Sequence, residues 1–137
     1  GHSLRKGMVY VYDITASAAT NEDKIINQDC YAGDGCGTRV KLNGVNKIAM
    51  GAHFSDADAK WSGSVMFYER TVEGWEQKRR FTGYDIESRD YFGHAVSFLD
   101  DFALVGATGD DEKANHAGSA WICPTTEDPP VYNPTCP

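Results

Sequence analysis

The sequence predicts an all-β protein built from a repeated unit of short strands. Three observations support this fold class: similar segments return at an offset of 55 or 56 residues, turn residues divide each segment into stretches of strand length, and no stretch keeps a helical periodicity. The sequence GMVYVY at residues 7–12, for example, returns as GSVMFY at residues 63–68 and as GSAWIC at residues 118–123. Repeats of this length that consist of short strands are typical of propeller blades and related β arrays.

The central copy of the repeat is complete and contains four predicted strands. Turn residues such as Asn43-Gly44 separate them, and the side chains alternate between two faces, so that Val65 and Phe67 share one face of the third strand. The four strands are predicted at residues 38–42, 47–52, 64–69 and 75–81.

The first and last copies are incomplete. The first begins at its third strand, predicted at residues 8–12, and its fourth strand falls within residues 21–26. The last copy has three predicted strands, at residues 94–98, 102–107 and 119–123. After them, Pro129-Pro130 argues against an ordinary fourth strand. We therefore divide the chain into an expression-tag remnant at residues 1–3, a repeat region at 4–123 with repeats at 7–62, 63–117 and 118–123, and a Pro-rich tail at 124–137.

Length and composition limit the class of protein. At 137 residues the chain has the size of one domain, and a hydrophobic content of 41% is too high for a disordered segment. The net charge of −7, from 13 basic and 20 acidic residues, repels phosphate backbones and predicts no binding to nucleic acid. No apolar run approaches the ~20 residues needed to cross a bilayer, so no membrane span is expected.

The four cysteines predict disulfide bonds. Cys30 and Cys36 bracket a loop rich in Gly and Asp, while Cys123 and Cys136 bracket the Pro-rich tail. Two local disulfides would fasten the segments with the weakest strand signals, and they favour an oxidising compartment. Free thiols and a zinc site remain alternatives, although the spacings differ from those of common zinc pairs. Four cysteines allow three pairings, and the sequence does not choose among them.

Three segments of the last repeat carry a resemblance to a known family. The sequence YFGHAV at residues 91–96, followed by ALVGAT at 103–108 and GSAWI at 118–122, resembles the FG-GAP repeat. That repeat forms the blades of the integrin α-chain β-propeller and of many secreted or surface proteins in bacteria and unicellular eukaryotes. The resemblance implies integrin-like propeller blades and a secreted or cell-surface location.

The expected packing of a propeller agrees with this resemblance. Phe92 would wedge between neighbouring blades, and Gly93 would allow the backbones to approach closely. The central copy departs from the pattern, because Cys36 replaces the aromatic residue of Phe-Gly and His53 replaces the Pro of Gly-Ala-Pro.

Calcium is a possible ligand of this chain, but it is not expected in the loop between the first two strands, where many integrin blades bind it. Many integrin blades hold calcium in an Asp-rich loop between their first two strands, and the corresponding links here, residues 43–46 and 99–101, are too short. The loops between the second and third strands are acidic instead, and clustered carboxylates can bind calcium. The alternative is a solvated turn in which Asp side chains accept hydrogen bonds from nearby backbone. The candidate calcium ligands are Asp56, Asp58, Asp110 and Asp111.

Three residues are candidates for binding a ligand. Trp61 lies in a loop, where an exposed indole could stack on a sugar or on a side chain of a partner. His53 and His116 belong, with His94, to segments that could converge at one end of the blades. A catalytic role for these histidines lacks support, because the sequence contains no recognisable arrangement of nucleophile and base.

About two and a half repeats cannot close a propeller, which needs four to eight blades. The chain is therefore expected to be a piece of a longer propeller or to form a homo-oligomer. Exchange of strands between copies would give about two blades per chain, so that a trimer, the favoured state, would have six blades and a tetramer eight.

The function expected from these observations is that of a non-enzymatic extracellular binding or adhesion module, which recognises a protein or a glycan through its loops. Two alternatives remain: a structural unit whose role is self-assembly, and an accessory domain of a secreted hydrolase.

Overall fold

The computed structural model describes residues 6–115, 117–125 and 135–136. These residues form ten β-strands and no helix, which confirms the predicted all-β fold class. The first sheet contains β1 (Val9–Ile14) and β2 (Ala19–Ile25). The central sheet contains β3 (Arg39–Asn43), β4 (Lys47–Ala52), β5 (Ser64–Thr71), β6 (Gly74–Gly83) and β10 (Thr135–Cys136). The last sheet contains β7 (Phe92–Leu99), β8 (Phe102–Ala107) and β9 (Ser119–Pro124).

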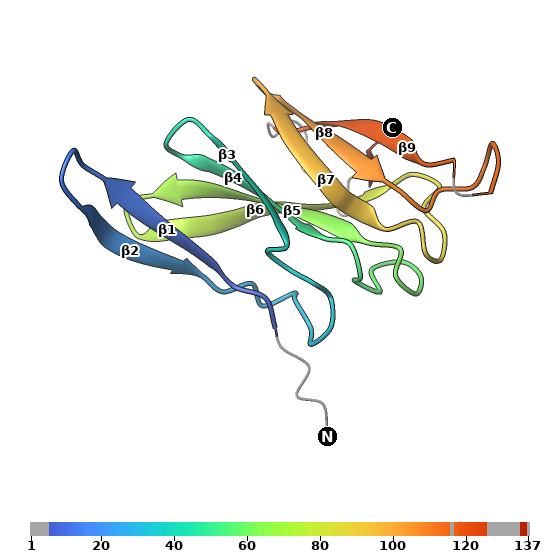
Figure 1. Ribbon diagram of the computed structural model, residues 1–137, viewed down its shortest axis with the longest axis horizontal. Helices are drawn as coiled ribbons and strands as arrows, with labels where there is room; N and C mark the ends of the chain where they lie inside the picture. Colours follow the sequence, from blue (N-terminus) through green and yellow to red (C-terminus); the bar gives the residue numbers. More distant parts are fainter. Residues whose placement is uncertain (1–5, 116, 126–134, 137) are drawn as a thin grey trace.

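The three sheets lie side by side in the order of the chain, with the central sheet between the other two (Figure 1). Successive strands pair in antiparallel fashion within each sheet, and β10 adds to the central sheet by pairing in parallel with β6. Among the described residues, β9 has no strand beyond it and ends the last sheet. No helix suited to crossing a membrane occurs in this part of the chain.

The strand register repeats along with the sequence. Met50 on β4 lies opposite Met66 on β5, and 55 residues further on Val105 of β8 lies opposite Trp121 of β9. The whole ladder between β4 and β5 recurs between β8 and β9 at this offset. The internal repeat of the sequence is therefore a repeat of three-dimensional structure.

Alternating side chains bury both sides of the central sheet. Val65 and Phe67 point toward the last sheet, whereas Met66 and Tyr68 point toward the first sheet, and all four are nearly inaccessible to solvent. This alternation, predicted from the sequence, gives the chain two hydrophobic layers in place of one core. The layer between the first and central sheets consists of Val9, Ile25, Cys30, Cys36, Ile48, Met50, Ala52, Met66 and Tyr68.

Close backbone approach joins the central sheet to the last one. Phe92 is fully buried between them, as predicted, and its backbone forms an isolated bridge with Gly63. A Cβ atom on Gly63 would collide with the carbonyl oxygen of Phe92. Gly7 meets the carbonyl oxygen of Cys36 in the same way, so Cys36 occupies the place that Phe92 takes one repeat later.

The structure contains the disulfide between Cys30 and Cys36, and both residues are buried. Cys123 is also buried and disulfide-bonded. The side chain of Cys136, and most of the Pro-rich tail, lie outside the described residues.

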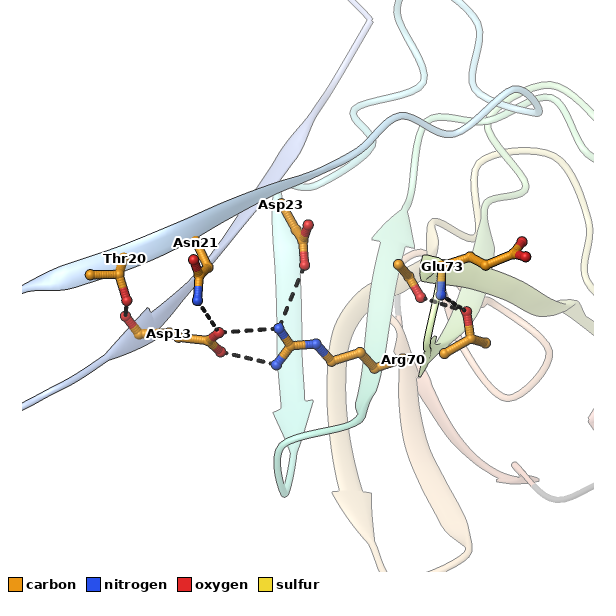
Figure 2. A network of polar contacts seen from close by, with 8 residues as sticks. Asp13, Thr20, Asn21, Asp23, Arg70 and Glu73 are labelled. Atoms are coloured by element: carbon orange, nitrogen blue, oxygen red, sulfur yellow. Dashed lines mark hydrogen bonds and ion pairs between the residues drawn. The ribbon is translucent and has the colours of Figure 1, made fainter.

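An ionic network fastens the first sheet to the central one (Figure 2). Arg70, near the end of β5, donates two hydrogen bonds of 2.9 and 3.2 Å to the carboxylate of Asp13 on β1. Its guanidinium also lies 3.7 Å from a carboxylate oxygen of Asp23 on β2. The Arg70 hydrogen bonds, followed by one from Asn21, hold the pKa of Asp13 below its usual range.

Candidate functional site

Five aromatic side chains gather where the loop between β4 and β5 meets the beginning of β7. His53 and Phe54 follow β4 directly, and Trp61 comes near the end of the same loop. Tyr91 precedes β7, and His94 lies on it. We call these five residues the aromatic cluster.

The rings of the aromatic cluster are in mutual contact. The ring centroid of His53 lies 4.1 Å from that of Phe54 and 5.1 Å from that of His94. Tyr91 meets Phe54 edge-on at 5.8 Å and lies nearly parallel to Trp61 at 6.5 Å. The site therefore draws its rings from both the central and the last sheets.

One end of the cluster is buried, and the other end is exposed to solvent. His53 is only 7% exposed, whereas 41% of Phe54 and 37% of Trp61 face solvent. Two pockets, of about 240 and 510 Å³, lie between neighbouring sheets elsewhere and include no residue of the cluster. The cluster is thus an exposed aromatic surface, suited to binding by contact more than by enclosure.

Side-chain hydrogen bonds fix the loop that carries Trp61. The buried hydroxyl of Ser62 accepts hydrogen bonds from the backbone of Asp58 and Ala59, and a carboxylate oxygen of Asp56 accepts one of 2.8 Å from the Trp61 amide. These contacts hold Trp61 at a φ of 59°, in the left-handed region, which costs a residue with a Cβ atom about 1–2 kcal/mol.

The loop is also bonded to the segment that leads into β7. The carbonyl oxygens of Lys60, Trp61 and Ser62 accept hydrogen bonds from the amides of Arg89, Tyr91 and Phe92, at 3.0, 3.2 and 2.8 Å respectively. Arg89 and Tyr91 have φ values of 75° and 58°. This ladder places the aromatic side chains of two separate loops on one surface.

Cationic groups flank the exposed indole. The Nζ atom of Lys60 lies 5.0 Å from the centroid of the Trp61 ring, and the Cζ atom of Arg89 lies 5.8 Å from it. Both are within the range of a cation–π contact. Two cations therefore flank the exposed indole, and the carboxylate of Asp56 lies in the same loop.

His53 is held in its neutral form. The Thr38 hydroxyl donates its proton to the carbonyl oxygen of Gly35, so the 3.2 Å contact with His53 requires Nδ1 of the imidazole to be the donor. Burial lowers the pKa of His53, and the neighbouring His94 and Arg39 lower it further. The buried imidazole of His53 thus carries no charge near neutral pH.

The acidic loops that were candidates for calcium use carboxylates to accept hydrogen bonds from their own backbone. The carboxylate of Asp56 accepts the Trp61 amide, and the carboxylate of Asp110 accepts the Glu112 amide at 3.1 Å. Over the described part of the chain, no three His, Cys, Asp or Glu side chains form a group that could hold a metal ion. These contacts match the alternative of a hydrogen-bonded turn at Asp56 and Asp110. Calcium binding by Asp56, Asp58, Asp110 and Asp111 stays a prediction.

Of the three predicted ligand-binding residues, the structure brings two together. Trp61 and His53 both belong to the aromatic cluster, and His116 lies outside the described residues. Sequence reasoning did not find Phe54 and Tyr91. The sequence could have indicated them by their position, because Phe54 follows His53 and Tyr91 precedes Phe92.

Comparison with known proteins identifies part of the chain. Residues 75–123 match the family model of the FG-GAP repeat. The match spans β6 to β9 and includes Tyr91 and His94 of the cluster, and it confirms the resemblance over that stretch. No curated protein matches the chain.

Proposed function

We propose, from the FG-GAP repeat that residues 75–123 match, that this chain is an integrin-like propeller module that binds a glycan, without catalysis, through the aromatic cluster. The observation that carries the proposal is the exposure of Phe54 and Trp61 on a loop whose backbone is fixed by hydrogen bonds. Because the rings are already ordered, the protein loses little conformational entropy when a ligand stacks on them.

The flanking cations narrow the expected chemistry of the glycan. Lys60 and Arg89 can donate hydrogen bonds to hydroxyl groups, and they attract carboxylate or sulfate groups on a sugar. An acidic glycan would therefore find both an apolar surface for its ring and a partner for its charge.

An extracellular location is part of the same proposal. The buried disulfide between Cys30 and Cys36, together with a disulfide-bonded Cys123, supports it, because such bonds persist in oxidising compartments.

A protein ligand is the second candidate. Trp, Tyr and Arg are the residues most enriched at energetic hot spots of protein interfaces; Trp61 and Tyr91 belong to the cluster, and Arg89 flanks it.

The proposal can be tested with a glycan array followed by titration of the best glycan. Trp61→Ala and Phe54→Ala should each weaken that binding at least tenfold. Phe102→Ala is the matched control, because Phe102 is an aromatic residue, 50% exposed, at the opposite end of the strands. Binding that survives both cluster substitutions would overturn the proposal. An array without any bound glycan, combined with capture of a protein that Trp61→Ala abolishes, would favour the second candidate.

A further inference from the structure

Each sheet has one side toward the preceding sheet of the chain and one toward the following sheet. In the central sheet, Met66 and Tyr68 lie on the preceding side, whereas Ala49 and Phe67 lie on the following side, and all four are buried. Every internal interface of the molecule therefore joins the following side of one sheet to the preceding side of the next.

Within the described part of the chain, the two ends of the stack leave one side of each kind uncovered. On the first sheet, Tyr10 and Tyr12 are 49% and 44% exposed, and they are the repeat equivalents of Met66 and Tyr68. Among the described residues, these tyrosines do not belong to the hydrophobic layer between the first and central sheets.

The last sheet shows the complementary exposure. Leu104 and Ile122 are 50% and 61% exposed, and they are the repeat equivalents of the buried residues Ala49 and Phe67. Large apolar side chains stand here at positions that are covered one repeat earlier. The following side of the last sheet thus has the character of an interface surface.

We propose that a second copy of this chain covers these surfaces, with the last sheet of each copy stacked on the first sheet of the other. The occupant is specified by the repeat itself, because the two uncovered sides correspond to the two halves of an interface that the molecule forms twice internally. The contact is head to tail, and it buries Leu104 and Ile122 against Tyr10 and Tyr12.

The proposed number of copies is two. Closed propellers have four to eight blades, and a chain with three stacked sheets reaches this range in two copies, as a ring of six. A twofold axis then relates two identical contacts.

This stoichiometry differs from the trimer expected from the sequence. That expectation required β1 of one copy to enter a sheet of another as its third strand. In the last sheet β9 already pairs with β8 along its whole length, from Ala107 opposite Ser119 to Phe102 opposite Pro124. The third-strand position is occupied, and stacking of whole sheets replaces strand exchange.

The first measurement is the mass in solution by light scattering over a series of protein concentrations. The expected result is a species of twice the 15.0 kDa chain mass. A monomer at every concentration, or a trimer, would overturn the proposal.

Two substitutions test the geometry. Tyr10→Arg and Ile122→Arg each place a charge on one uncovered side, and each should raise the dimer dissociation constant at least tenfold while circular dichroism stays unchanged. Val72→Arg is the control, since Val72 is fully exposed in the turn between β5 and β6.

Mixing the two variants should restore association, because one contact in the mixed dimer joins two unaltered sides. An effect from one substitution alone would indicate a contact between like sides and would contradict the proposal. The glycan experiment is independent of these results, since the substituted residues lie outside the aromatic cluster.

Discussion

At the scale of single residues, the most informative exchange is that of a disulfide for an aromatic ring. Cys36 stands where the next repeat has Phe92, and both are buried between two sheets beside a glycine of the preceding sheet. A cysteine alone fills less space than a phenylalanine. Its bond to the fully buried Cys30 adds a second side chain to the layer and ties the loop in place.

Removal of this disulfide should destabilise the fold. For a bond with a sequence separation of 6, the loss of loop constraint alone amounts to about 2 kcal/mol. We expect Cys30→Ala/Cys36→Ala to lower the free energy of unfolding by about 2–4 kcal/mol in urea denaturation. Cys30→Ala/Cys36→Phe should recover part of this loss, because it restores the aromatic wedge. An unchanged midpoint in the alanine variant would contradict this account of the layer.

His53 gives the protein a dependence on pH. Because burial lowers its pKa from the ordinary 6.5, the unfolded chain binds a proton at a pH where the folded protein does not. The free energy of unfolding should therefore decrease as the pH falls through about 6.5. Between pH 7.5 and 5.5 the melting temperature of the wild-type protein should fall further than that of His53→Gln. Parallel curves for the two proteins would assign the pH dependence to other groups.

At the scale of elements, the two glycines that precede β5 and β9 differ in their role in packing. Gly63 and Gly118 are repeat equivalents and have φ values of 90° and 71°, so an alanine at either position pays the left-handed penalty of about 1–2 kcal/mol. Only at Gly63 would the added Cβ also collide with the backbone of Phe92. At Gly118 the nearest atom, the carbonyl oxygen of Ala107, is 3.4 Å away.

This pair provides a matched test of close packing between sheets. Gly63→Ala should lower the free energy of unfolding by about 3 kcal/mol or more, and Gly118→Ala by about 1–2 kcal/mol. Thermal or urea denaturation of both variants gives the difference. Equal losses would show that backbone conformation, and not the approach of the sheets, determines the glycine requirement.

The first sheet has two strands, and such hairpins are marginally stable alone. Arg70 connects it to the central sheet through Asp13 and Asp23. Substitution of Arg70 by Met leaves two neighbouring carboxylates without their shared cation. We expect Arg70→Met to speed proteolytic cleavage in the turn between β1 and β2 several-fold. Lys24→Met is the control, since Lys24 pairs with Glu22 within one strand, and it should leave the cleavage rate near that of the wild type.

At the scale of the whole molecule, the repeat made most of the fold predictable. The strands β1 to β9 were predicted within a few residues of their observed bounds, and those at residues 47–52 and 102–107 agree with β4 and β8, whereas β10 in the Pro-rich tail was not predicted. Period-two alternation within strands and the constant offset between copies are local signals, so they survive without knowledge of tertiary contacts.

The aromatic cluster was only partly predictable, for a physical reason. Its rings meet because Trp61, Arg89 and Tyr91 adopt left-handed backbone conformations in two linking segments. Bulky residues rarely adopt this conformation, and tertiary hydrogen bonds impose it here. Side chains in irregular segments follow no period, so the sequence could indicate an exposed indole but not its neighbours.

The burial of the central sheet on both sides has a consequence for how the molecule opens. In a stack of repeats, stability is approximately the sum of each unit and its contacts with nearest neighbours. The central sheet has two such contacts, and each outer sheet has one within the chain. In a variant that does not dimerise, such as Ile122→Arg, amide hydrogen exchange should therefore be slowest in β4 and β5 and faster in β2 and β9, through partial openings that release one end at a time. Uniform protection across all three sheets would instead mean that the chain opens as a single cooperative unit.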